Sequence, residues 1–126
     1  MIVIDYKDNR PLYEQIVERF QVLIEKGVLK PETQIPSVRS LAMELSINPN
    51  TIQKAYAELE RRGFIYTVKG RGNFVAYDEE LKQKRRKELS DIFQNMVLEA
   101  HNAGISRQEL LDIIDKVFEK EGGEGD

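Results

Sequence analysis

The sequence predicts a mainly α-helical protein with one small β-hairpin, and three observations lead to this prediction. Apolar residues recur every three or four positions along five stretches of the chain, as they do on the buried face of an amphipathic helix. One short stretch is instead rich in aromatic and β-branched residues and is interrupted by Gly70 and Gly72, which is typical of a hairpin. The 126 residues, 40% hydrophobic and 33% charged, fit one small domain with an appendage.

The first helix is predicted from Pro11 to Glu25. Proline suits the first helical position, and Gly27 lies just beyond the end, where glycine commonly terminates a helix. One face of this helix should be buried, because its apolar residues follow the helical spacing. They are Leu12, Ile16, Phe20, Leu23 and Ile24.

A second helix is predicted over residues 38–45, behind Ser37, which is a good N-cap. Only Ser46 and Ile47 separate this helix from the N-cap of the next one. Two helices joined by so short a turn must cross at a steep angle, which is the geometry of a helix-turn-helix. The apolar stripe of the second helix is Val38, Leu41, Ala42 and Leu45.

The third helix opens with Asn48 as N-cap and Pro49 at its first position, and it ends before Gly63. Its apolar stripe is Ile52, Ala55, Tyr56 and Leu59. The polar residues off that stripe should face the groove of a nucleic acid, because Asn and Gln suit adenine whereas Thr and Lys suit phosphate. These candidates are Asn50, Thr51, Gln53 and Lys54. A merely solvated face is the alternative, and Asn48 can serve as cap, contact or both.

A β-hairpin is predicted after Gly63, with strands at 64–68 and 73–77 and a tip at 69–72. Glycines allow positive backbone dihedral angles at the tip, where two basic side chains stand at the most exposed point. A helix-turn-helix followed by such a hairpin is a winged helix-turn-helix, which we assign to residues 1–77. Gly70 and Gly72 precede a strand instead of opening a helix, so they do not form a nucleotide-binding motif.

Two more helices are predicted at the C-terminal end, the first from Glu80 until Gly104 and the second behind Ser106, which forms a capping-box pattern with Glu109. Their apolar stripes are too extensive to leave in water, so residues 78–120 should form a dimerisation segment that packs on an identical pair. Docking on the winged helix is the alternative. The Gly- and acid-rich residues 121–126 should be a disordered tail.

Charge is distributed unevenly along the chain. Residues 1–77 carry 11 Lys or Arg and 9 Asp or Glu, a net charge of +2, whereas residues 78–126 carry 8 and 13, a net charge of −5. Any surface that contacts nucleic acid should therefore lie in the first part. The basic run at 82–87 could touch phosphates, but a solvated helix face is the simpler interpretation, and we do not count it as a site.

Composition excludes several other classes of protein. There is no cysteine, and His101 is the single histidine, so neither a disulfide framework nor a Cys/His metal site can form. The sequence shows no secretory leader and no run of the roughly 20 apolar residues that a membrane span needs. No motif places a nucleophile beside a base. We expect a cytoplasmic protein that is not an enzyme, binds no cofactor and makes no contact with a membrane.

Several motifs occur in a fixed order: IPSVRSLA at 35–42, NPNTI at 48–52, AYAELE at 55–60 and GRGNFV at 70–75. On these residues the chain resembles the GntR family of bacterial transcription regulators over about residues 9–77, and its short two-helix C-terminal part resembles the YtrA subfamily. Glu32 and Ser46 stand where glycine is usual in the family, and Asn73 stands where threonine is frequent. All three departures lie in turns or in the wing.

The resemblance implies a further DNA contact at Arg39, whose guanidinium can bind guanine or grip a phosphate. A solvated Arg39, or one paired with Glu44 or Glu58, is the alternative. Ser37 in the same motif is either a contact or only an N-cap. The wing tip should sit over the minor groove or the flanking backbone, where its cations find negative potential. Its residues are Lys69, Gly70 and Arg71.

The sequence therefore predicts a sequence-specific transcription regulator, a repressor that binds a double-stranded DNA operator with inverted-repeat symmetry as a homodimer. A winged helix that binds only other proteins is the alternative. A small apolar pocket between the C-terminal helices of two subunits could hold an unknown small-molecule effector. Phe93 and Met96 would line it, although both residues also suit a plain core.

Overall fold

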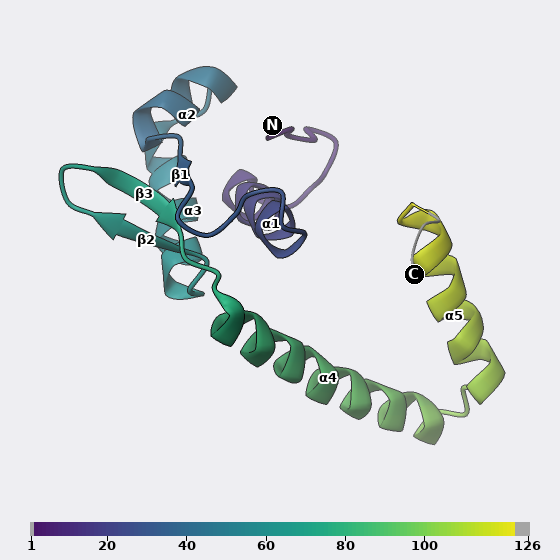
Figure 1. Ribbon diagram of the computed structural model, residues 1–126. Coiled ribbons are helices and arrows are strands. Elements are labelled where there is room, and N and C mark those ends of the chain that lie inside the picture. The colour runs from purple at the N-terminus through teal and green to yellow at the C-terminus, as the bar shows by residue number, and fades with distance from the viewer. Residues whose placement is uncertain (1, 123–126) are drawn as a thin grey trace. The chain divides into compact units, whose positions relative to one another are not determined.

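The computed structural model describes residues 2–122, which form five helices and three short strands (Figure 1). The chain divides into two compact units, one up to Lys82 and one from Gln83 onward. In chain order the elements are α1 (Leu12–Glu25), β1 (Gln34–Ile35), α2 (Val38–Leu45), α3 (Pro49–Arg61), β2 (Ile65–Val68), β3 (Gly72–Val75), α4 (Glu79–Asn102) and α5 (Arg107–Lys120). The mainly helical fold with a small hairpin is confirmed.

The first unit has one hydrophobic core, built where α1, α2 and α3 meet the sheet. Phe20 of α1 is fully buried and meets the ring of Tyr56 from α3 edge to face, with 5.7 Å between the ring centroids. Aromatic pairs of this geometry add to the free energy of area burial. Apolar residues from every element of the helix-turn-helix are buried in this core, including Ile16, Ile24, Ile35, Leu41, Ile52, Leu59 and Val75.

The sheet has three antiparallel strands in the order β1-β3-β2, so the prediction of a two-stranded hairpin was incomplete. β1 pairs Gln34 with Phe74 and Ile35 with Asn73. A strand of two residues shows no alternation of apolar and polar side chains, and its partner lies far along the chain, so no local pattern announces it. The hairpin strands are also shorter than predicted, because residues 76 and 77 lead out of the sheet toward α4.

The helix boundaries agree with the predicted ones to within about two residues at each end. Pro11 is the N-cap of α1 and not its first residue. α4 begins at Glu79, just before the predicted Glu80, and Asp78 accepts a hydrogen bond from the amide of Leu81 at 2.9 Å. The capping box at the start of α5 is confirmed, since Ser106 and Glu109 exchange side-chain and backbone hydrogen bonds.

Two residues other than glycine lie in left-handed backbone within the described chain, Glu32 with φ of 73° and Ser46 with φ of 54°. Both are positions where the resemblance noted from the sequence implies glycine, which enters this region without steric cost. Ser46 ends α2 in the short turn of the helix-turn-helix. The two departures in sequence therefore coincide with positions of backbone strain.

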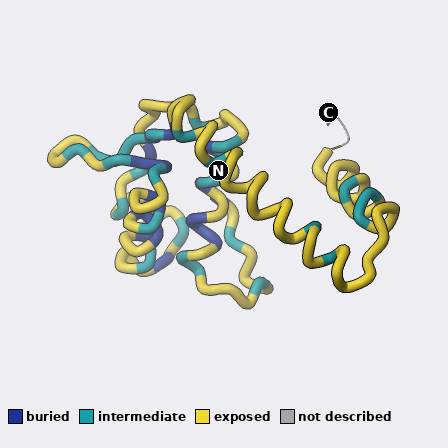
Figure 2. The backbone as a smooth tube through the Cα atoms, turned by 90° about the horizontal axis from the view of Figure 1, so that it is seen from below, coloured by how far each residue is buried: buried dark blue, intermediate teal, exposed yellow. Residues whose placement is uncertain are grey.

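The second unit consists of most of α4 together with α5, and none of its described residues is buried. Figure 2 shows the contrast, with buried segments confined to the first unit and exposed backbone along both helices of the second. No helix in the described range 2–122 is long and apolar enough to cross a membrane. Glu121 and Gly122 follow α5, and the rest of the predicted disordered tail, 123–126, lies outside the described residues.

Candidate nucleic-acid interface

The N-terminal end of α3 is open to solvent and is built as predicted. The Oδ1 atom of Asn48 accepts a hydrogen bond from the amide of Asn50 at 2.8 Å, and Pro49 occupies the first turn. Asn48 is thus the N-cap, and its side-chain NH2 group makes no hydrogen bond within the described chain, so capping leaves a donor free for a ligand. Asn50 and Gln53 are exposed, whereas Thr51 is half-buried.

The first turn of α2 carries an arginine without an acidic partner among the described residues. Ser37 caps α2, since its hydroxyl oxygen accepts from the amide of Ser40 at 3.0 Å. Arg39 in the first turn is exposed and makes no ion pair or hydrogen bond with any residue between 2 and 122. The sequence left open a pair with Glu44 or Glu58, and neither pair forms.

Glu58 is instead committed to the other end of α3. It accepts hydrogen bonds from Arg61 Nη2 at 2.5 Å and from Arg62 Nε at 2.7 Å. These bonds lower the pKa of Glu58 to about 2, with the bond from Arg61 contributing most. Arg62 also donates to Gln21 of α1 at 3.0 Å. The cations at the C-terminal end of α3 are therefore engaged within the protein.

A buried tyrosine fixes the start of α2 against α3. The hydroxyl of Tyr56 donates to the carbonyl oxygen of Pro36 at 2.7 Å, one residue before the N-cap Ser37. Burial raises the pKa of Tyr56, as does the nearby Glu44 carboxylate, so the phenol keeps the proton that this hydrogen bond requires. The start of α2, which carries Arg39, is thus held against the middle of α3.

Lys54 departs from the expectation of a side chain that projects freely. Its ammonium nitrogen lies 4.0 Å from the centroid of the Tyr13 ring of α1, which is a cation–π contact. The residue is exposed, yet the charge is directed toward α1. A tyrosine 41 positions earlier gives no local signal of this contact in the sequence. The DNA contact assigned to Lys54 stays a prediction.

The wing tip is a tight turn that carries two free cations. The amide of Arg71 donates to the carbonyl oxygen of Val68 at 2.9 Å, and Gly70 has φ of 79°, as the third position of a type II turn requires. Lys69, Gly70 and Arg71 are all exposed. Neither Lys69 nor Arg71 forms an ion pair or a side-chain hydrogen bond to a described residue. Figure 1 shows the hairpin reaching away from the helices to this tip.

Some basic residues of the first unit are held in ion pairs within the protein. Arg10 pairs with Asp8 at 2.6 Å and Glu18 at 2.9 Å, and its hydrogen bonds lower the pKa of both carboxyl groups. The arginines at the C-terminal end of α3 are paired in the same way through Glu58. Three of the predicted DNA contacts, Arg39, Lys69 and Arg71, form no ion pair with an acidic residue among those described, a property they share with Lys7, Arg19 and Lys30.

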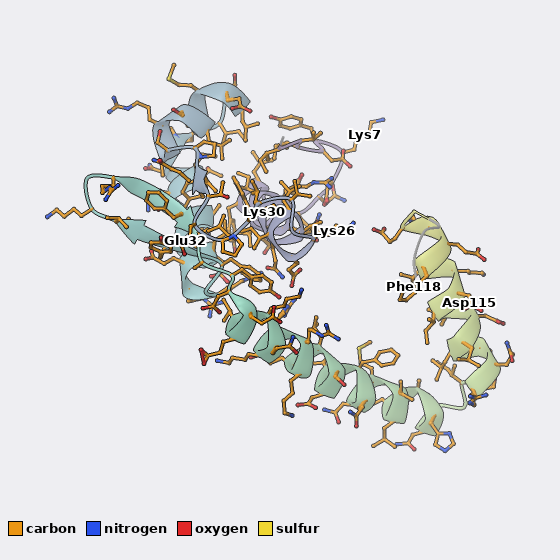
Figure 3. All side chains as sticks on the ribbon, viewed as in Figure 1. Lys7, Lys26, Lys30, Glu32, Asp115 and Phe118 are labelled. Carbon is orange, nitrogen blue, oxygen red and sulfur yellow. The ribbon has the colours of Figure 1, made fainter. Side chains whose placement is uncertain are left out.

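Residues that brace the wing were missed by the sequence analysis. The Nε2 atom of Gln34 donates to the carbonyl oxygen of Arg71 at 2.9 Å, and the hydroxyl of Tyr66 donates to Glu32 Oε2 at 2.6 Å. Figure 3 labels Glu32, which lies against the hairpin. Gln34 and Arg71 stand 37 positions apart, so no local pattern predicts their contact. The one signal in the sequence is Glu32, which stands where the family resemblance implies glycine.

The described chain has an apolar depression on α4 and no cluster of side chains for a metal ion. No cluster of three or more His, Asp or Glu that could hold a metal ion occurs between residues 2 and 122. A shallow, mostly apolar depression lies on α4, and its lining includes Phe93 but not Met96. The remaining lining residues are Gln94, Val97, Leu98 and His101, so the depression is formed by a single helix.

Two helices joined by a short turn, the second of them open to solvent at its start, and a hairpin with a cationic tip together define a winged helix-turn-helix protein. The family described as "Bacterial regulatory proteins, gntR family" matches residues 12–75. The chain belongs to this GntR family.

Individual relatives extend the likeness beyond the winged helix. The HTH-type transcriptional repressor YtrA of Bacillus subtilis is 37% identical over 119 residues, which cover 93% of this chain and 92% of the repressor. The structure of a GntR family transcriptional regulator from Listeria monocytogenes superposes with a TM-score of 0.70 at 33% identity, covering 90% of this chain and 98% of that one. The YtrA-like character of the chain is thereby confirmed.

A second similar structure contains DNA. It is the AraR DNA-binding domain in complex with the operator ORR3, with a TM-score of 0.52 and 31% identity, and the match covers 59% of this chain and 89% of that domain. The match to this DNA-binding domain spans little more than half of this chain.

Proposed function

We propose that this protein is a cytoplasmic transcriptional repressor that binds an inverted-repeat DNA operator as a homodimer. The observation that carries the proposal is the open start of α3, where the amide side chains of Asn50 and Gln53 are exposed, together with Arg39 in the first turn of α2, a cation without an acidic partner in the described chain. Amide side chains bind adenine edges, and a guanidinium binds guanine or phosphate. The AraR domain bound to its operator and the repressor YtrA support the same role.

In this proposal the start of α3 enters the major groove, with Asn50, Gln53 and Arg39 toward the bases. The wing tip follows the adjacent backbone or minor groove, where Lys69 and Arg71 neutralise phosphates. Thr51, Lys54 and the caps Asn48 and Ser37 would reach phosphates at the edge of the groove. The ion-paired arginines at the far end of α3 take no part.

Dimerisation would rest on the second unit. Large apolar side chains on α4 and α5 are about half exposed, including Ile92 at 52%, Phe93 at 51% and Phe118 at 59%. Apolar surface of this extent is rare on a monomer and is ordinarily covered by a partner. A symmetric pair would present two recognition helices, so half-sites roughly one helical turn apart, about 10 bp, or a multiple of it are expected.

The first test is binding of the purified protein to its own upstream intergenic DNA and to scrambled DNA across a salt series. A protected inverted repeat, preferred on the order of 1,000-fold, is the expected result. Arg39→Ala should weaken operator binding by about 1–3 kcal/mol if the guanidinium binds a base edge in the operator. Arg61→Ala is the matched control, because it removes the same charge from the far end of α3.

The competing function is a winged helix that binds other proteins and has no specific DNA site. It predicts equal and weak binding to operator and scrambled DNA, with no difference between Arg39→Ala and Arg61→Ala. The unpaired cations at the wing tip favour the DNA-binding function over this alternative.

A further inference from the structure

We infer that Gln34 is a positioning residue for DNA binding, which sets where the cations of the wing tip stand relative to the recognition helix. The inference rests on the proposed function, since it requires the wing to contact DNA. Gln34 is exposed, lies on β1 and is not itself one of the predicted DNA contacts, so its role would be exerted through the wing.

Gln34 contacts the wing directly through its side-chain amide. Gln34 reaches the hairpin at the residue that bears a wing cation, since its Nε2 atom donates to the carbonyl oxygen of Arg71 at 2.9 Å. A Cβ atom added at Gly72 would lie 2.7 Å from the same nitrogen, so the absence of a side chain there makes room for the amide. Gly72 has φ of 125°, which also favours glycine.

Apart from Gln34, the contacts near the tip lie within the hairpin itself: the hydroxyl of Thr67 donates to Asn73 Oδ1 at 2.7 Å, and the amide of Arg71 donates to the carbonyl oxygen of Val68 at 2.9 Å. β2 and β3 pair over four residues, from Ile65 with Val75 to Val68 with Gly72, and a hairpin of two short strands is marginal without further support. β1 pairs with β3 only at Phe74 and Asn73, nearer the base. The side chain of Gln34 therefore supports the hairpin at the turn itself, beyond the last backbone pair between β1 and β3.

The segment that carries Gln34 also connects the wing to the recognition helix. The chain from Glu32 to Pro36 is held at its start by Tyr66 of β2, whose hydroxyl donates to Glu32 Oε2 at 2.6 Å. It is held at its end by Tyr56 of α3, whose hydroxyl donates to the carbonyl oxygen of Pro36 at 2.7 Å. One short segment thus joins the wing to the frame of α3, and Gln34 lies in the middle of it.

The test uses Gln34→Met in the full-length protein, because methionine keeps the length of the side chain and removes the amide donor. Gln21→Met is the matched control, since Gln21 also forms one long-range side-chain hydrogen bond, with Arg62 at 3.0 Å, but does not touch the wing. Gln34→Met should lower operator affinity by about 3- to 10-fold, the worth of one positioned hydrogen bond. Gln21→Met should leave affinity unchanged, and the two variants should melt at similar temperatures.

A double-mutant cycle separates positioning from any effect that does not involve the wing. In a Lys69→Ala, Arg71→Ala background, Gln34→Met should have almost no further effect, because the cations it positions are gone. That background itself should show a shallower salt dependence, by roughly 0.9 in slope for each phosphate that is no longer neutralised. An equal loss of affinity from Gln34→Met in both backgrounds, or none in the wild type, would overturn the inference.

Failure of the proposed function would give a different result. If the wild-type protein has no preference for an operator, both the function and the inference are wrong. If Arg39→Ala weakens binding but removal of Lys69 and Arg71 changes neither affinity nor salt dependence, the function stands and only the role of Gln34 falls.

Discussion

The winged helix and the helices from Gln83 onward show the same kind of amphipathic pattern, but they differ in what covers their apolar faces. In the first unit Ile16, Phe20 and Ile52 are fully buried by other elements of the same unit. In the second unit Leu89, Met96 and Val117 are between 45% and 61% exposed. A helical stripe of apolar residues therefore predicts a buried face, but it does not indicate whether the covering surface belongs to the same unit.

The largest effect should come from separating the two units. A fragment ending at Lys82 should unfold cooperatively in a thermal melt, because its core is complete without the remainder. It should bind an intact operator roughly 100-fold or more weakly than the full chain, since the second half-site is no longer reached through a tethered partner. Equal affinity of fragment and full chain would show that the C-terminal helices contribute nothing to DNA binding.

Two phenylalanine substitutions should sharpen the comparison between the units. Phe20→Ala should lower the free energy of unfolding by about 3–5 kcal/mol, because a fully buried ring leaves a cavity, and the loss should not depend on protein concentration. Phe93→Ala should have an effect that appears only through association, as a shift of the monomer–dimer equilibrium in sedimentation experiments. A concentration-independent loss for Phe93→Ala would mean that its partner lies within the same chain.

The smallest effect concerns pH and the ion pairs of Glu58. Its pKa is about 2 in the folded protein and ordinarily 4.5, so the pairs with Arg61 and Arg62 stabilise the fold fully above pH 4.5 and this contribution is lost as pH falls toward 2. Glu58→Gln should lower the melting temperature slightly at pH 7, because the pairs are solvent-exposed. The gap to the wild type should close between pH 4.5 and 2, and a gap that stays constant with pH would contradict this assignment.

Much of the fold could be predicted because its helices carry local start and stop signals. Ser37, Asn48 and Ser106 were each predicted as N-caps, and each accepts the expected hydrogen bond from a backbone amide. Caps act over two or three residues, so a sequence reveals them directly. The helix-turn-helix and the hairpin follow from these signals and from the glycines between them.

The parts that could not be predicted depend on contacts between distant residues. β1 is defined by its pairing with β3, and the position of the Lys54 ammonium depends on Tyr13 of another helix. Neither has a periodic pattern in the sequence. The individual DNA contacts remain predictions as well, since they depend on a partner molecule and not on this chain alone.

Ser46 gives the protein a position where stability can be altered without touching any surface proposed to bind DNA. Its left-handed backbone costs an L-residue roughly 1–2 kcal/mol, and its side chain forms no hydrogen bond within the described chain to offset that cost. Glu32 has the same backbone strain but also holds Tyr66, so a change there would alter the wing. In evolutionary terms, a mutation of Ser46 to glycine would raise the stability of the fold and could compensate for a useful but destabilising mutation elsewhere in the chain.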